Sequence, residues 1–183
     1  MVKLMSFIGI SICLGYGSRA SLRAPRSHGF YRFWAWEFIL ALLVLNVDVW
    51  FLTPGSWNQL ISWFLLVASV SPLVLGVHSL MTRGEPAARR SDDETLLGFE
   101  KTTKLVTTGI YHYIRHPLYC SLLLLAWGTF FKTLSWLGLL LVLGATLAVF
   151  ATARADELAS LRYFGAPYRA YMERTKRFVP FLF

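Results

Sequence analysis

Apolar stretches alternate with polar segments along the whole chain. The four clear stretches are Phe33 to Leu52, Leu60 to Met81, Leu118 to Phe131 and Leu134 to Ala153. A weaker stretch, Leu4 to Gly17, precedes them. About 20 apolar residues in a helix cross a hydrocarbon core of about 30 Å. Only Lys132 and Thr133 separate the last two stretches, which predicts a tight helical hairpin. The pattern predicts an all-α, polytopic membrane protein with about five transmembrane helices.

The division of the chain follows from the spacing of these stretches. We interpret residues 1–183 as a single domain with three N-terminal transmembrane helices in 1–81, a cytoplasmic loop in 82–117, the helical hairpin in 118–153 and a cytoplasmic tail in 154–183. The first apolar stretch could alternatively be a signal peptide. Arg19 disfavours this interpretation, because a cleavage site has small residues where this chain has a charge. The loop begins with a polar, turn-rich run from Arg83 to Glu94, which predicts a solvated excursion.

Composition and charge support a membrane protein and give its orientation. The chain is 56% apolar and only 15% charged, which is too few charges for the surface of an ordinary soluble domain. All Lys and Arg residues except Lys3 and Lys132 fall in 18–32, 82–117 or after residue 153. Because basic residues concentrate on the cytoplasmic side, we predict the N-terminus outside and the tail in the cytoplasm. This asymmetry accounts for the net charge of +8, so nucleic acid is not a predicted partner.

Polar side chains that can carry chemistry gather just before the fourth stretch. His112, Arg115 and His116 lie there among three tyrosines. An interfacial anchor is the plainer interpretation of such a group. A metal site from the two histidines is disfavoured, because Pro117 opposes the α conformation at His116 and no third ligand has matching spacing. We therefore predict no metal.

An acidic pair follows the last stretch. Asp156 and Glu157 come where the fifth helix leaves the membrane. Since the two helices of a hairpin have similar lengths, the start of one and the end of the other become neighbours, which places Arg115, His116 and Tyr119 near Arg154 and the acidic pair. Carboxylates beside aromatic rings suit a cationic, adenosine-like cofactor.

At these residues the sequence resembles a known family. The motifs are Leu105 to Tyr111, Arg115 to Tyr119, the acidic pair, Phe164-Gly165 and Tyr168 to Tyr171. In this order they resemble the integral-membrane methyltransferases that include isoprenylcysteine carboxyl methyltransferase and the phospholipid methyltransferases. The resemblance implies an S-adenosylmethionine pocket formed by the last two helices, the preceding loop and the tail.

The resemblance also implies roles for individual residues. The cofactor contacts carried over are Lys104, Leu105, Val106, Tyr111, His116, Pro117, Leu118, Tyr119, Asp156 and Glu157. Prenylcysteine-type members have an arginine where this chain has Thr152, so Arg154 is the candidate for orienting an anionic acceptor. His112 is the candidate base for an amine or thiol acceptor, whereas a carboxylate needs none.

The function expected from the resemblance is S-adenosylmethionine-dependent methyl transfer by in-line displacement at the membrane–cytoplasm interface. The partner is a lipophilic small molecule or lipid-modified substrate that enters from the membrane lipid, with an isoprenylcysteine-type carboxylate as the first acceptor. A phospholipid or a small lipophilic amine or thiol is the alternative acceptor. A non-enzymatic membrane scaffold or transporter subunit is the alternative class; we see no internal repeat of the kind that transporters carry.

Overall fold

The computed structural model describes residues 1–85 and 96–178. Most of the predicted solvated excursion and the last five residues of the tail lie outside the described residues. The helices are α1 (Val2–Gly17), α2 (Arg19–Arg23), α3 (His28–Asn46), α4 (Trp57–Arg83), α5 (Pro117–Phe130), α6 (Trp136–Phe164) and α7 (Ala166–Arg174). Apart from one isolated parallel bridge between Ile114 and Lys176, these two ranges contain no β-structure. The prediction of an all-α protein is confirmed.

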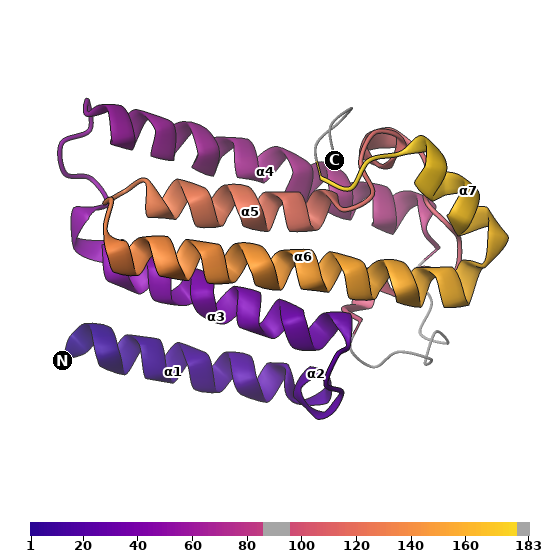
Figure 1. Ribbon diagram of the computed structural model, residues 1–183, viewed down its shortest axis with the longest axis horizontal. Coiled ribbons are helices and arrows are strands. Elements are labelled where there is room, and N and C mark those ends of the chain that lie inside the picture. Colours follow the sequence, from indigo (N-terminus) through magenta and orange to yellow (C-terminus); the bar gives the residue numbers. More distant parts are fainter. Residues whose placement is uncertain (86–95, 179–183) are drawn as a thin grey trace.

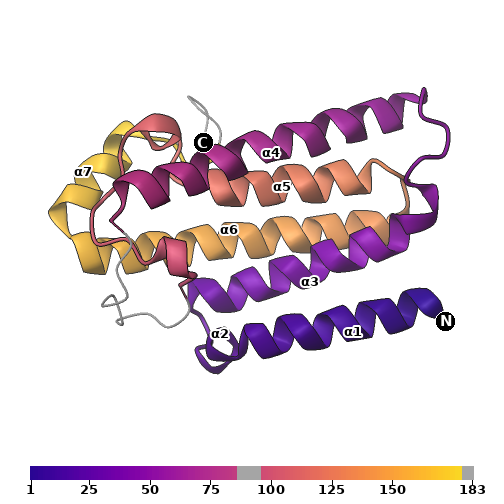
Figure 2. The same ribbon diagram turned by 180° about the vertical axis from the view of Figure 1, so that it is seen from behind.

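The five longer helices form one bundle. They lie side by side in the spatial order α1, α3, α6, α5, α4 (Figures 1 and 2), and α3 packs on α6 while α4 packs on α5. The start of α1 and the connections 47–56 and 131–135 lie at one end of the bundle (Figure 1). Helix α2, the segment 96–116 and α7 lie at the other end, which we call the α7 end. The longer connections therefore gather at a single end.

Three helical segments of the described chain are long and apolar enough to cross a membrane. They are His28–Val49, Trp57–Arg83 and Trp136–Phe164. Helices α1 and α5 are apolar but have only 16 and 14 residues. At about 1.5 Å per residue they rise roughly 24 Å and 21 Å, less than the hydrocarbon core. Membrane-spanning character is supported, and the count of five crossings stays a prediction.

Two helices extend beyond the apolar stretches that indicate them. Helix α3 begins at His28, before the stretch that starts at Phe33, because the Ser27 hydroxyl accepts a hydrogen bond from the Phe30 amide at 3.1 Å and caps the helix. Helix α6 continues beyond the last stretch, which ends at Ala153, to Phe164. The break comes at Gly165, whose φ of +66° is readily adopted by glycine.

Small residues let the central helices approach closely. A Cβ at Gly144 of α6 would lie 2.9 Å from Phe38 of α3, and one at Gly128 of α5 would lie 3.0 Å from Leu66 of α4. Ala126 and Ala145 are fully buried between the same helices. Close backbone approach of this kind is how helices associate where the surrounding solvent is itself apolar.

A buried lysine ties the opposite end of the bundle together. Lys132, in the α5–α6 connection, is 1% exposed. Its Nζ donates to Gln59 Oε1 at 2.9 Å and to the carbonyl of Trp50 at 3.3 Å. It also lies 3.7 Å from the centre of the Trp63 ring. Oxygen acceptors and an aromatic face thus hold the ammonium in place.

We predict that Lys132→Ala lowers the thermal midpoint of unfolding by about 5 °C, because a buried acceptor and a cavity remain. The measurement is thermal unfolding of the detergent-purified protein. Lys3→Ala is the matched control, since Lys3 is a partly exposed lysine at the same end of the bundle and pairs with Asp48. An equal effect of both substitutions would contradict the assignment.

Candidate functional site

The segment before α5 is fastened to the tail through backbone hydrogen bonds. The amide of Arg115 donates to the carbonyl of Lys176 at 2.8 Å, and the amide of His116 donates to that of Arg177 at 3.1 Å. The amide of Lys176 donates back to the carbonyl of Tyr113 at 3.3 Å. Pro117 is the first residue of α5, where its missing N–H costs no hydrogen bond because the first N–H groups of a helix have no partner within the helix. The start of α5 and the tail therefore form one unit at the α7 end.

A buried carboxylate on α6 binds both parts of this unit, the segment before α5 and the tail. Glu157 is 4% exposed. It accepts from Arg115 Nε at 3.0 Å and from Arg177 Nε and Nη2 at 3.1 and 2.6 Å. Arg115 also donates to the carbonyls of Met172 and Thr175. We call Glu157, Arg115 and Arg177 the clamp; charge-assisted bonds of this kind are strong when every charge is paired.

His116 lies between the two members of the acidic pair. Its Nε2 is 3.3 Å from Glu157 Oε1 and its Nδ1 is 3.6 Å from Asp156 Oδ2. The ring stacks on Tyr119, whose hydroxyl donates to Asp156 Oδ2 at 3.2 Å. Burial alone would lower the pKa of His116, but the two carboxylates outweigh it and raise the pKa above the usual 6.5. The protonated form of His116 is therefore favoured between the two carboxylates.

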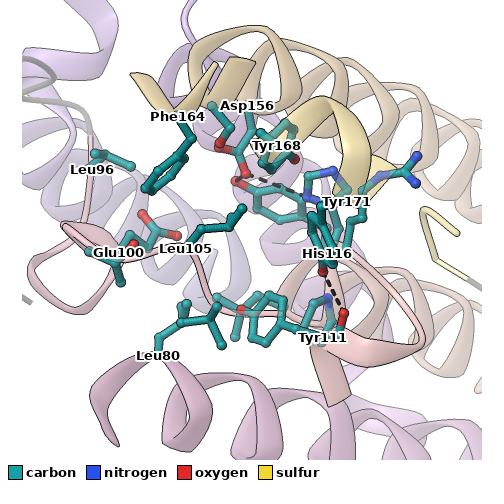
Figure 3. A pocket seen from close by; sticks show the side chains of 17 residues that line it. Leu80, Leu96, Glu100, Leu105, Tyr111, His116, Asp156, Phe164, Tyr168 and Tyr171 are labelled. Atoms are coloured by element: carbon teal, nitrogen blue, oxygen red, sulfur yellow. Dashed lines mark hydrogen bonds and ion pairs between the residues drawn. The ribbon is translucent and has the colours of Figure 1, made fainter. Parts of the chain in front are cut away.

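His116, Tyr119 and Asp156 form part of the wall of a cavity at the α7 end. Its lining comes from α4, the segment before α5, the start of α5, the end of α6 and α7, and Figure 3 shows the labelled side chains around this space. The lining residues are Leu80, Leu96, Glu100, Thr102, Leu105, Val106, Tyr111, Arg115, His116, Pro117, Leu118, Tyr119, Asp156, Ser160, Phe164, Tyr168 and Tyr171. Elements far apart in the sequence thus build a single site.

The cavity offers two carboxylates among aromatic rings. The Asp156 side chain is 26% exposed and so remains accessible. Glu100 accepts from Arg32 at 2.6 Å and from the amide of Leu97 at 2.8 Å. Burial raises the pKa of Tyr111 well above 10, which keeps this phenol neutral. Acids beside neutral rings suit a cationic ligand that also carries hydroxyl groups.

Most of the residues expected to contact a cofactor do line this cavity. The structure brings together Leu105, Val106, Tyr111, His116, Pro117, Leu118, Tyr119 and Asp156. Their convergence follows from the hairpin and from the fastening of the tail. The cofactor role of each residue stays a prediction, which their common position supports.

The other expected site residues lie elsewhere. Glu157 is behind the wall, in the clamp. Lys104 is exposed and pairs with Glu85 at 3.6 Å, and His112 is exposed with its ring against Tyr113. Arg154 is exposed and lines a different cavity. The catalytic roles expected for His112 and Arg154 thus stay predictions that this geometry does not support.

Several lining residues were missed by sequence reasoning. Leu80, Leu96, Glu100 and Thr102 come from α4 and from the loop, where no local pattern marks them. Ser160 and Phe164 follow Asp156 at intervals of four, and this spacing, which places all three on the same face of a helix, is the signal that could have identified them.

Comparison with known proteins gives one match. The family model described as phospholipid methyltransferase matches residues 73–164, about half of the chain. The matched range runs from the second half of α4 to the end of α6 and contains most of the cavity lining. No curated protein and no solved structure matches the chain.

We predict that Glu157→Gln loosens the clamp, because removal of the carboxylate charge leaves two guanidinium groups without their counter-ion, at a cost of about 3 kcal/mol. Hydrogen exchange should then accelerate at residues 113–116 and 176–178, with residues 120–130 unchanged. Glu173→Gln, at an exposed position on α7, should leave all of these rates unchanged. Wild-type protection in Glu157→Gln would contradict the role of the clamp.

We also predict a stability change with pH that depends on His116. Its pKa in the folded protein is raised, so the stabilisation is fully present below about pH 6.5 and is lost as pH rises through the folded pKa. The thermal midpoint measured from pH 6 to 9 should therefore fall more in wild type than in His116→Gln. His112→Gln, at an exposed position, should follow wild type. Equal slopes in wild type and His116→Gln would refute this assignment.

Proposed function

The chain belongs to the phospholipid methyltransferase family, and on that premise we propose that it transfers a methyl group from S-adenosylmethionine to a lipophilic acceptor at the α7 end. The observation that carries the proposal is that the family match and the cavity fall on the same residues. His116, Tyr119 and Asp156 lie inside the matched range and inside the cavity wall.

The residues of the cavity fit this cofactor chemically. Asp156 and Glu100 are acceptors for ammonium and hydroxyl groups, and Arg115 is a donor for a carboxylate. The faces of Phe164 and Tyr168 favour a positive centre. The cavity holds about 100 Å³, less than the roughly 300 Å³ at which small-molecule pockets begin, so binding requires lining side chains to move apart.

In this reaction the protein has to position the two reactants and does not have to activate the methyl group. When bound, S-adenosylmethionine supplies a methyl group already activated by a positive sulfur. The chain's residues hold the two reactants in line and exclude water. The two carboxylates beside His116 raise its pKa, and burial raises the pKa of Tyr111, so we assign the role of base to neither residue.

An acceptor that needs no base fits this cavity best. A carboxylate of the isoprenylcysteine type is such an acceptor and is our first candidate. The family description favours a second candidate, the amine of a phospholipid. For an amine or a thiol, a proton must be removed, and His112 remains the predicted base only for that case. A scaffold or a transporter subunit is disfavoured because neither accounts for membership of a methyltransferase family.

We also propose that the α7 end faces the cytoplasm. Arg83, Arg115 and the basic residues of α7 lie at this end, whereas Lys3 and Lys132 lie at the other. The positive-inside bias then orients the bundle with its N-terminus outside. The soluble cofactor would reach the cavity from the cytoplasm, and the acceptor would reach it from the bilayer.

We predict that the detergent-purified protein binds S-adenosylhomocysteine, the demethylated product, and that Asp156→Asn weakens binding about tenfold, because one charge-assisted hydrogen bond is worth about 1.5 kcal/mol. The measurement is isothermal titration calorimetry. Glu173→Gln, also a carboxylate-to-amide change at the α7 end, should bind as wild type does. Folded wild type that binds none would contradict the proposal.

The acceptor class is tested separately with radiolabelled S-adenosylmethionine. We expect label in a farnesylated cysteine analogue that carries a free carboxylate, and no label in its preformed methyl ester. Transfer to phosphatidylethanolamine alone would replace the first candidate acceptor with the second. Transfer to neither acceptor by a preparation that binds the cofactor product would reject both acceptors and keep the cofactor site.

A further inference from the structure

A second cavity lies at the α7 end, on the side of α6 that faces α3. It has a volume of about 390 Å³. The turn before α3 contributes Arg26, α3 contributes His28 and Tyr31, and α6 contributes Arg154, Leu158 and Arg162. The described residues that line it include three arginines and a histidine but no acidic residue.

This cavity and the first one use opposite faces of α6. Asp156, Ser160 and Phe164 line the first cavity, and Arg154, Leu158 and Arg162 line the second. Each set is spaced by four residues, and the sets are offset by two positions, which is about 200° around a helix. A ligand that Arg154 and Arg162 bind therefore lies on the opposite face of α6 from Asp156, and the proposed reaction belongs to the first cavity.

The arginines of the second cavity have no counter-ion among the described residues. In the ranges 1–85 and 96–178, no carboxylate forms an ion pair with Arg26, Arg154 or Arg162. Like charges that line one cavity repel each other, and an anion between them removes that cost. Arg26 also has φ +73°, a conformation that side chains rarely adopt. Strain of this kind often accompanies a binding site.

An apolar surface leads from the far end of the bundle to this cavity. Leu140, Leu143 and Leu147 are exposed on α6. They continue the three- and four-residue spacing that leads to Arg154 and Leu158, so all five residues share one side of the helix. An acyl chain laid along these leucines would bring its head group to the arginines. The ligand that fits is therefore an anion that carries a hydrocarbon chain.

We propose that the second cavity binds the phosphate group of an anionic phospholipid, as a site separate from methyl transfer, with Arg26, Arg154 and Arg162 as its donors. Arginine forks match phosphate oxygens in a bidentate manner, and pairs of this kind are stronger than neutral hydrogen bonds. The proposal goes beyond the proposed function and does not rest on it.

The test is native mass spectrometry of the full chain in detergent, titrated with phosphatidylglycerol or with phosphatidylcholine of the same acyl chains. We expect phosphatidylglycerol to bind about tenfold more tightly, since a net charge of −1 meets three cations. Arg26→Gln/Arg154→Gln should weaken its binding about 100-fold, or about tenfold per guanidinium. The variant Arg26→Gln/Arg154→Lys should bind phosphatidylglycerol more tightly than Arg26→Gln/Arg154→Gln, because the lysine restores one of the two lost charges.

Controls separate the site from general charge and from folding. Arg169→Gln removes one exposed arginine of α7 outside the cavity and should bind the lipid within about twofold of wild type. The thermal midpoint of each variant reports folding. Equal binding of both lipids, or undiminished phosphatidylglycerol binding by the double variant, overturns the proposal. Inorganic phosphate that binds as tightly as phosphatidylglycerol overturns the part played by the acyl chain.

Discussion

The arrangement of the α7 end depends on one buried carboxylate. Glu157 on α6 contacts Arg115 and His116 of the segment before α5 and Arg177 of the tail. Three parts of the chain, namely this segment, α6 and the tail, therefore meet at one side chain. Because a buried charge is costly unless it is fully paired, none of the partners can leave without penalty. The neighbouring Asp156 is thereby held at a fixed position on the cavity wall, with its side chain 26% exposed.

Much of this organisation was predictable from local patterns. Apolar periodicity located the helices, and the short connection at Lys132 gave the hairpin that brings His116 next to Asp156. Ordered motifs from Leu105 onward located most of the cavity lining. The sequence did not predict that Asp156 lines the cavity while Glu157 binds the arginines of the clamp. Adjacent residues of a helix point about 100° apart, and only packing decides which of them faces the cavity.

The remaining differences have the same origin in helix geometry. Helix α6 continues past the end of the apolar stretch at Ala153 and stops at Gly165, because charged residues are good helix formers. Ser160 and Phe164 lie on this extension, outside the residues for which the resemblance implies a cofactor contact. Arg154 looked adjacent to the acidic pair in sequence, yet two positions along a helix turn it to the opposite side. Proximity in sequence was a poor guide wherever the helical repeat was ignored.

The length of α6 has a consequence for the choice of substrate. From Trp136 to Asp156 the helix rises about 30 Å, which equals the thickness of the hydrocarbon core. If Trp136 lies at the far interface, the length of α6 therefore places Asp156 at the level of the lipid head groups on the other side. Under the proposed methyl transfer, an acceptor would then be selected by the depth of its reactive atom as well as by its chemistry. A nucleophile at the polar end of a membrane-embedded molecule would meet the cavity, whereas one in the middle of the bilayer would not reach it.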